Sequence, residues 1–332
     1  MRALATAGLA LALLPPALPA QADTAFVPTD AWAFVDNTHD DVTRLQQPGG
    51  PAGSLTAPDP YGQISGLAPS QDGKRFAFID ITSDACCADD RIVVKSASGS
   101  TVRIYDDGGY AFSGFGFKTQ PHLSPSATRV AFTWITKSTD NQIGLWDLVN
   151  GRHTKLSGTA GLTAQAWLTT RWLLATSADG VVTTSANGGG SHQAVTGLTT
   201  KDRQFAVSPD GKKIAWSRRT SADFADPEVS DLYVADLTVT IGGVATVSNV
   251  TQLVTGQDNV SPTWTRDGQR VVFVQATGAG GGGGSKPGYY EPIGTGKRGV
   301  IPASGGQAAF YVSRLSVSQV AVVNLSGTCA HC

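Results

Sequence analysis

The clearest pattern along this chain is an apolar run, a polar turn and a second apolar run, repeated through most of its length. The best copy is residues 206–216 (AVSPDGKKIAW), and residues 68–78, 122–132 and 263–273 align with it without gaps. Residues 166–175 are a degraded copy. Apolar, β-branched and aromatic residues on both sides of a turn predict a pair of strands. A unit that recurs about every 40 to 60 residues is typical of a repeat architecture such as a propeller.

The polar turn of the best copy is Ser208-Pro209-Asp210-Gly211. Proline presets φ to the value that the turn needs, aspartate hydrogen-bonds nearby backbone, and glycine takes positive φ without steric cost. The turn is therefore predicted to join the two apolar runs into a β-hairpin. The second run of each copy is apolar nearly throughout, which favours a strand buried on both faces, as between stacked blades.

A third apolar strand follows several of the hairpins. These strands are predicted at residues 91–94, 143–148, 181–183 and 232–237. Three or four short strands per unit are typical of a propeller blade, so the sequence predicts an all-β propeller. The aromatic position of the second strand, counted from Phe34, gives six blades; seven blades, with Phe310 starting another unit, is the alternative. Residues 317–325 are predicted to complete the first blade, so that strands from both ends of the chain close the ring.

Residues 1–22 have the pattern of a secretory signal peptide. Arg2 supplies the positive charge, residues 4–14 the apolar segment, and a small-residue cleavage site ends at Ala22. The apolar segment is too short for a transmembrane helix, and no later segment approaches that length. We therefore expect a secreted protein, periplasmic where the source has an outer membrane, in which residues 23–332 form one domain.

The cysteines fit an exported protein. There are four, Cys86, Cys87, Cys329 and Cys332. An even number in such a chain favours structural disulfides, and four cysteines allow three pairings that the sequence does not distinguish. A zinc site and a redox-active pair are the alternatives. Adjacent cysteines are poorly placed for tetrahedral zinc, and the second pair stands at a chain end rather than at a helix N-terminus.

The charge balance excludes some partners. The chain has 25 Lys and Arg residues against 26 Asp and Glu residues, a net charge of −1. That balance does not predict a surface for nucleic acid or for anionic lipid. The partners that remain are a protein, a peptide or a glycan, and we expect the chain to be monomeric.

No catalytic motif stands out. The chain has no Gly-x-Ser-x-Gly elbow and no His-Glu-x-x-His sequence. A metal-dependent enzyme on a propeller needs several ligands at one mouth of the channel, and His122 is the histidine placed just before a turn on a predicted innermost strand. The equivalent positions in the other copies are Ala68, Ala166, Ala206 and Thr263, which carry no ligand. We therefore predict no metal and no cofactor, and keep His122 as a binding residue of the channel.

Three aromatic residues complete the set of predicted binding residues. Trp134 precedes a polar loop that starts at residue 136. Tyr289 and Tyr290 follow a run of glycines, inside an insertion at residues 277–298 that is longer than most loops. Long loops on a rigid scaffold commonly carry recognition, so we expect these three side chains to contribute to binding.

The repeat resembles that of the TolB-type six-bladed propeller family. The resemblance lies in the SPDGK turn at residues 208–212, the apolar strand that ends at Trp216 and the strand at residues 231–237, which ends in Asp-Leu. It covers nearly all of residues 25–325. TolB itself is a periplasmic protein that binds a peptidoglycan-associated lipoprotein, and related propellers occur as accessory domains of peptidases and as lyases. Only a few residues separate the predicted cleavage site from the first strand, so we expect the N-terminal α/β domain of TolB to be absent.

The resemblance and the missing catalytic motifs together favour one function. We expect a secreted, non-catalytic TolB-like propeller that binds a protein, peptide or glycan through one face or through the channel mouth. The alternative is a propeller enzyme, a polysaccharide lyase or a hydrolase, that acts at the channel mouth. Because propellers host many activities, the fold alone does not separate the two.

Overall fold

The structure is a computed structural model, and the part of the chain that it describes is all β. It describes residues 31–36, 41–45, 52–56, 62–84, 87–106, 117–135, 141–188, 190–220, 229–255, 258–276, 286–290, 298–300 and 317–323. Within these ranges every regular element is a β-strand. No helix with the length and apolarity needed to cross a membrane occurs in them.

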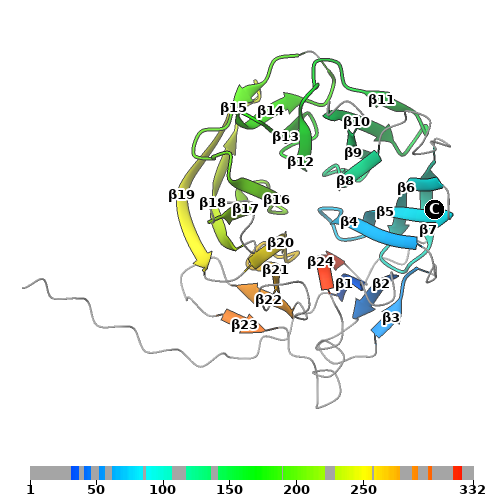
Figure 1. The fold of residues 1–332 in the computed structure, drawn as a ribbon. Coiled ribbons are helices and arrows are strands. Elements are labelled where there is room, and N and C mark those ends of the chain that lie inside the picture. Colours follow the sequence, from blue (N-terminus) through cyan, green and yellow to red (C-terminus); the bar gives the residue numbers. More distant parts are fainter. Residues whose placement is uncertain are drawn as a thin grey trace, which may run out of the picture.

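Three sheets follow the order of the chain, each with four antiparallel strands. They are β4 (Gly62–Pro69), β5 (Arg75–Asp84), β6 (Cys87–Ser96) and β7 (Thr101–Tyr105); β8 (Phe117–Leu123), β9 (Arg129–Ile135), β10 (Asn141–Asp147) and β11 (His153–Lys155); and β12 (Thr163–Trp167), β13 (Trp172–Ser177), β14 (Gly180–Ser185) and β15 (Gln193–Ala194). In each sheet the first strand lies nearest the centre of a ring and the last lies at its perimeter (Figure 1). Sheets arranged radially in this way form a β-propeller.

A further sheet has eight strands. They are β16 (Asp202–Val207), β17 (Lys213–Arg219), β18 (Ser230–Val239), β19 (Ala245–Val254), β20 (Asp258–Trp264), β21 (Val271–Ala276), β22 (Lys286–Tyr290) and β23 (Arg298–Val300). Strands β16 to β19 pair antiparallel, as do β20 to β23. The two sets are joined by one parallel pair of residues, Ser230 and Asp258.

The remaining sheet combines strands from the two ends of the chain. Its order is β24 (Val317–Val323), β1 (Ala31–Asp36), β2 (Asp41–Leu45) and β3 (Ala52–Ser54). Strand β24 pairs antiparallel with β1, with Val320 opposite Phe34. The predicted pairing of the last strand with the first sheet is therefore confirmed.

The hydrophobic core consists of layers between neighbouring sheets. Ile79 of β5 packs with Phe132 of β9 in one layer, and Leu174 of β13 packs with Trp216 of β17 in another. Residues 76–79 of β5 are at most 2% exposed, so consecutive side chains on both faces of the strand are buried. This confirms the prediction made from the apolar second run, because a strand between two sheets buries both faces.

The turns that join first and second strands have the chemistry that the sequence predicts. Ser208 Oγ donates to Asp210 Oδ1 at 2.6 Å, and the same carboxylate oxygen accepts the backbone N–H of Lys212 at 3.0 Å. Gly211 has a φ of 72°. Thr265 and Asp267 make the equivalent side-chain bond at 2.6 Å. Because each turn is held by its own residues, it forms the same way in successive copies.

Part of the predicted insertion at residues 277–298 is a regular strand. Residues 286–290 form β22, in which Tyr289 is opposite Val272 and Tyr290 is opposite Val271. Aromatic residues favour a strand whose neighbour carries β-branched side chains. The preceding run of glycines led to the prediction of a long loop instead. Residues 277–285 and 291–297 lie outside the described residues.

Candidate binding site at the ring axis

The innermost strands enclose a cavity at the ring axis. Its volume is about 230 Å³. The lining comes from the ends of five strands and from the turns that follow them: residues 66–71 and Gly73, residues 121–123 and Pro125, residues 165–168, residues 204–207 and Pro209, and residues 261–264 and Arg266. The cavity thus lies where equivalent parts of β4, β8, β12, β16 and β20 meet.

Each of these five strands has a break in its pairing register beside the cavity. The breaks fall between Ser65 and Ala68, Thr119 and His122, Ala164 and Ala166, Arg203 and Ala206, and Val260 and Thr263. Gly66, Gln204 and Ser261, which lie within three of the breaks, have φ of 68°, 53° and 53°. A β-bulge of this kind bends the strand and takes the extra residue out of the ladder. The bulges therefore turn backbone that would pair within a sheet toward the axis.

Glutamine side chains connect neighbouring bulges. The backbone N–H of Gln204 donates to Gln165 Oε1 at 3.3 Å, and the N–H of Ser261 donates to Gln204 Oε1 at 3.0 Å. Gln165 Nε2 in turn donates to Thr176 Oγ1 at 3.1 Å. A backbone N–H released from its ladder needs another acceptor, and the glutamine of the preceding inner strand supplies it. This chain of amides holds three inner strands in place around the cavity.

His122 lines the cavity. Its Nε2 is 3.2 Å from the carbonyl oxygen of Ala164, and its own carbonyl accepts Trp167 Nε1–H at 2.8 Å. Burial lowers the pKa of His122 to about 4, while the hydrogen bond to Ala164 acts in the opposite direction. The ring is therefore neutral near pH 7, and because a carbonyl accepts, Nε2 carries the proton.

The cavity wall has little charge. Among the described residues that line the cavity, His122 and Arg266 are the titratable side chains and none is a carboxylate. Arg266 is exposed at the rim. In the described part of the chain, no three His, Cys, Asp or Glu side chains lie close enough to hold a metal ion. This arrangement suits the binding of an uncharged or weakly anionic polar group.

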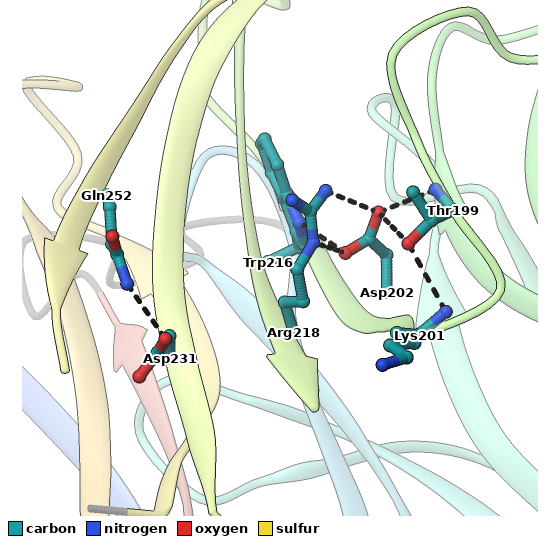
Figure 2. Close-up of polar contacts among 7 residues, drawn as sticks. All are labelled: Thr199, Lys201, Asp202, Trp216, Arg218, Asp231 and Gln252. Carbon is teal, nitrogen blue, oxygen red and sulfur yellow. Dashed lines mark hydrogen bonds and ion pairs between the residues drawn. The ribbon is translucent and has the colours of Figure 1, made fainter. Parts of the chain in front are cut away.

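A second polar cluster surrounds Asp202, the first residue of β16 (Figure 2). The Asp202 carboxylate is fully buried and accepts hydrogen bonds from Trp216 Nε1 at 2.9 Å and from Arg218 Nε and Nη2 at 2.5 and 2.9 Å. The backbone N–H and the hydroxyl of Thr199 donate to the same carboxylate at 2.7 and 3.2 Å. Hydrogen bonding to Asp202 is the main cause of a raised pKa for Arg218.

The Asp202 cluster is structural. Its polar atoms bond one another, and the Arg218 guanidinium also lies 4.7 Å from the ring centroid of Tyr233. Asp202 does not line the cavity. The carboxylate ties the loop before β16 to strand β17, which positions the inner strand that carries Gln204. Gln252 and Asp231 form a separate contact at 2.8 Å on the neighbouring strands (Figure 2).

Trp134, another predicted binding residue, is not among the lining residues of the cavity. Trp134 is 7% exposed, and its ring lies under the ammonium groups of Lys155 and Lys118, 4.4 and 5.6 Å from the ring centroid. Tyr289 and Tyr290 belong to β22, and their side chains lie outside the described part of the structure.

The cysteines contribute little to the described structure. Cys87 begins β6, with its backbone opposite Asp84. Cys86, Cys329 and Cys332 lie outside the described residues. The predicted disulfides and their pairing therefore stay a prediction.

Gln71, Gln165 and Gln204 were not among the residues predicted from the sequence. The sequence does contain a signal for Gln204. Two residues before the first position of the aligned repeat, the four best copies have Gly66, Gln120, Gln204 and Ser261. Glycine alternating with polar residues inside an apolar strand indicates a bulge. Gln71 stands where two other copies have proline, at Pro125 and Pro209.

Comparisons with known proteins support the fold. No protein-family model matches the chain, and no curated protein sequence does. TolB from Acinetobacter baumannii superposes with a TM-score of 0.55 at 17% identity, covering 81% of this chain and 62% of that one. A putative TolB from Agrobacterium tumefaciens gives 0.49 at 13% identity, covering 79% and 84%, and a prolyl endopeptidase gives 0.46 at 16%, covering 71% and 34%. The chain therefore has an all-β propeller fold like that of TolB, whose Acinetobacter representative it matches over less than two thirds of that protein's length.

Proposed function

We propose that this chain is a secreted, non-catalytic, six-bladed TolB-like propeller that binds a protein, peptide or glycan partner at its axial cavity. In this proposal residues 1–22 are a signal peptide and residues 23–332 are one monomeric domain without metal or cofactor. Six blades follow if the eight-stranded sheet counts as two, divided at its single parallel pair, Ser230 and Asp258.

One observation carries the binding role. Five inner strands from distant parts of the chain open bulges toward one cavity, and their described side chains there include amides and a neutral imidazole but no carboxylate. General acid–base chemistry needs a group that gains and loses protons near the working pH. The lowered pKa of His122 leaves it neutral at pH 7, and among the described lining residues the other titratable side chain is Arg266 at the rim. Recognition fits this set of residues better than catalysis.

The experiment compares two alanine-to-tryptophan variants of the secreted chain. Ala68 lines the cavity on β4, so Ala68→Trp fills it, whereas Ala194 is exposed on the perimeter strand β15 and Ala194→Trp leaves the cavity open. Wild-type protein is immobilised and probed with purified envelope proteins, their peptides and a glycan array. We expect a partner whose affinity falls at least about tenfold in Ala68→Trp and not in Ala194→Trp.

The same preparation tests the enzymatic alternative. If polysaccharide or peptide substrates are turned over, and His122→Ala abolishes the turnover while the protein stays folded, the chain is an enzyme and the proposal is wrong. Equal binding by both tryptophan variants would place the partner on another surface.

A further inference from the structure

The geometry points to Gln71 as a latch that closes the axial cavity. This inference deepens the proposed function, on which its biological role depends, because it adds a control of access to the same site. Gln71 lies in the turn between β4 and β5, and its Nε2 donates to the carbonyl oxygen of Ser208 at 3.4 Å and to that of Pro209. Those carbonyls belong to the turn between β16 and β17, which is 137 and 138 residues away along the chain.

The contact bridges the centre of the ring. Strands β4 and β16 lie on opposite sides of the central opening, and the turns that follow them point toward each other (Figure 1). Gln71 and Pro209 both line the axial cavity. Their contact therefore spans the cavity at the end that carries the hairpin turns, where a partner approaching from that face would enter.

Hydrogen bonds within each turn hold both turns in place, so the group that moves is the side chain of Gln71. Ser70 Oγ donates to Asp72 Oδ1 at 2.7 Å, and Ser208 Oγ donates to Asp210 Oδ1 at 2.6 Å. Each serine oxygen also accepts a backbone N–H five residues later, at 3.0 and 2.9 Å. Opening of the latch thus requires rotation of the Gln71 side chain, which takes nanoseconds or less, and no rearrangement of a hairpin.

Comparison of the copies within the chain supports a particular role for this position. The residue that follows the Ser or Thr of the turn is Gln71, Pro125, Pro209 and Arg266 in the four best copies. Proline fixes φ and is a favoured turn residue there, and it has no side-chain donor. Gln71 departs from that preference and supplies the carboxamide that reaches the opposite turn.

The latch is weak enough for a partner to open it. A neutral hydrogen bond between protein groups shifts an equilibrium by about 2- to 10-fold, so the closed form predominates but the open form stays populated. A partner that enters from this face replaces the carboxamide with its own donor to Ser208 and Pro209. Removing the latch should therefore strengthen partner binding by about 2- to 10-fold.

The first test needs no partner. In a ¹⁵N-labelled sample of the full secreted chain, the side-chain amide signals of Gln71 are assigned by their loss in Gln71→Glu. We expect their exchange with water to be slower than that of Gln269, an exposed turn residue whose Nε2 lies 3.4 Å from the Asp267 carbonyl oxygen. Equal exchange rates for Gln71 and Gln269 would overturn the latch.

The second test uses acrylamide as a neutral quencher of tryptophan fluorescence. Trp167 and Trp264 line the cavity, so opening of the latch should make them more accessible to acrylamide. We expect quenching to rise by up to the same 2- to 10-fold factor in Gln71→Ala and in Gln71→Glu. The glutamate variant keeps the size of the side chain but removes the donor. Gln193→Ala is the matched control, because Gln193 Nε2 donates to the Gly242 carbonyl at 3.2 Å at the ring perimeter. The gain should disappear when Trp167 and Trp264 are replaced by phenylalanine.

The outcomes separate the latch from the proposed function. Wild-type quenching in Gln71→Glu, or an equal rise in Gln193→Ala, would overturn the latch, with folding of each variant checked by circular dichroism. A latch seen by both tests, together with no cavity-dependent partner, would contradict the proposed function alone.

Discussion

At the scale of single residues, His122 shows how the cavity changes the chemistry of a side chain. A histidine on a strand is ordinarily free to protonate near pH 6.5. Here burial lowers the pKa to about 4 against the effect of the Ala164 carbonyl. The group stays neutral, so it offers one donor and one acceptor instead of a charge.

The lowered pKa of His122 predicts a loss of stability in mild acid. The unfolded chain takes up a proton near pH 6.5 and the folded chain only near pH 4, so the free energy of unfolding falls as the pH drops between these values. Between pH 7 and pH 4 the free energy of unfolding should fall by about 1–3 kcal/mol, a range that allows for the side chain being only half-buried. Urea unfolding at pH 7 and pH 4.5 measures the fall.

The His122→Gln variant isolates the effect of histidine protonation on stability. The variant lacks the titrating ring, so its free energy of unfolding should fall less than that of the wild-type protein over the same pH range. The difference at pH 7 gives the packing cost of the substitution and is subtracted. Identical pH dependence in the two proteins would show that His122 protonates as readily in the folded chain as in the unfolded one.

At the scale of elements, buried polar contacts align the strands with one another. Lys118 and Asp90, which are 2% and 4% exposed, connect β8 to β6 through Lys118 Nζ and the Asp90 carbonyl oxygen at 2.9 Å. Burial raises the pKa of Asp90, while hydrogen bonds and the charge of Lys118 lower it. Asp202 plays the equivalent part within the eight-stranded sheet, where it joins the loop before β16 to β17.

Asp202→Ala should destabilise the protein strongly. The substitution leaves Arg218 and the Trp216 N–H without their buried acceptor, and breaking a buried pair costs about 3–5 kcal/mol. Asp236→Ala is the matched control, because Asp236 also accepts from a cation, Lys213 at 2.7 Å, but its side chain is 42% exposed. An exposed pair contributes about 0–1 kcal/mol.

Thermal and urea unfolding of the two aspartate variants distinguish the cases. A loss for Asp202→Ala no larger than that for Asp236→Ala would mean that the Asp202 cluster does not hold β16 and β17 together. Near-ultraviolet circular dichroism should also change in Asp202→Ala, because Trp216 loses its hydrogen bond.

At the scale of the whole molecule, the pairing of β24 with β1 joins the two ends of the chain. Without β24, strand β1 presents an unpaired edge, and an open edge pairs with other chains. We expect a chain that ends at residue 316 to unfold at lower temperature and to aggregate. A chain that ends at residue 323 keeps β24 and serves as the control.

Both truncated chains are compared under reducing conditions, so that the loss of Cys329 and Cys332 does not enter the result. Size-exclusion chromatography and thermal unfolding give the aggregation and the midpoint. Equal behaviour of the two truncated chains would contradict a closing role for β24.

Sequence patterns predicted local structure more completely than contacts between sheets. The hairpins, their turns and the β24 pairing are confirmed, since short-range chemistry such as that of Ser208, Asp210 and Gly211 lies within a few residues. Of the predicted binding residues, His122 lines the cavity, and its role in binding stays a prediction. Trp134 was expected near a loop surface but is buried, because two lysine side chains and the neighbouring core cover its ring.

The order of apolar and polar residues was enough to determine that the chain builds a repeated β-hairpin, because strand periodicity and turn preference act over a few residues. Which side chains meet at the axis was decided by the tertiary structure. Gln71 reaches Pro209, and Gln165 reaches Gln204, only after separate sheets are arranged around one centre. No single repeat contains that information, because the arrangement depends on packing between sheets rather than on the conformation of any one of them.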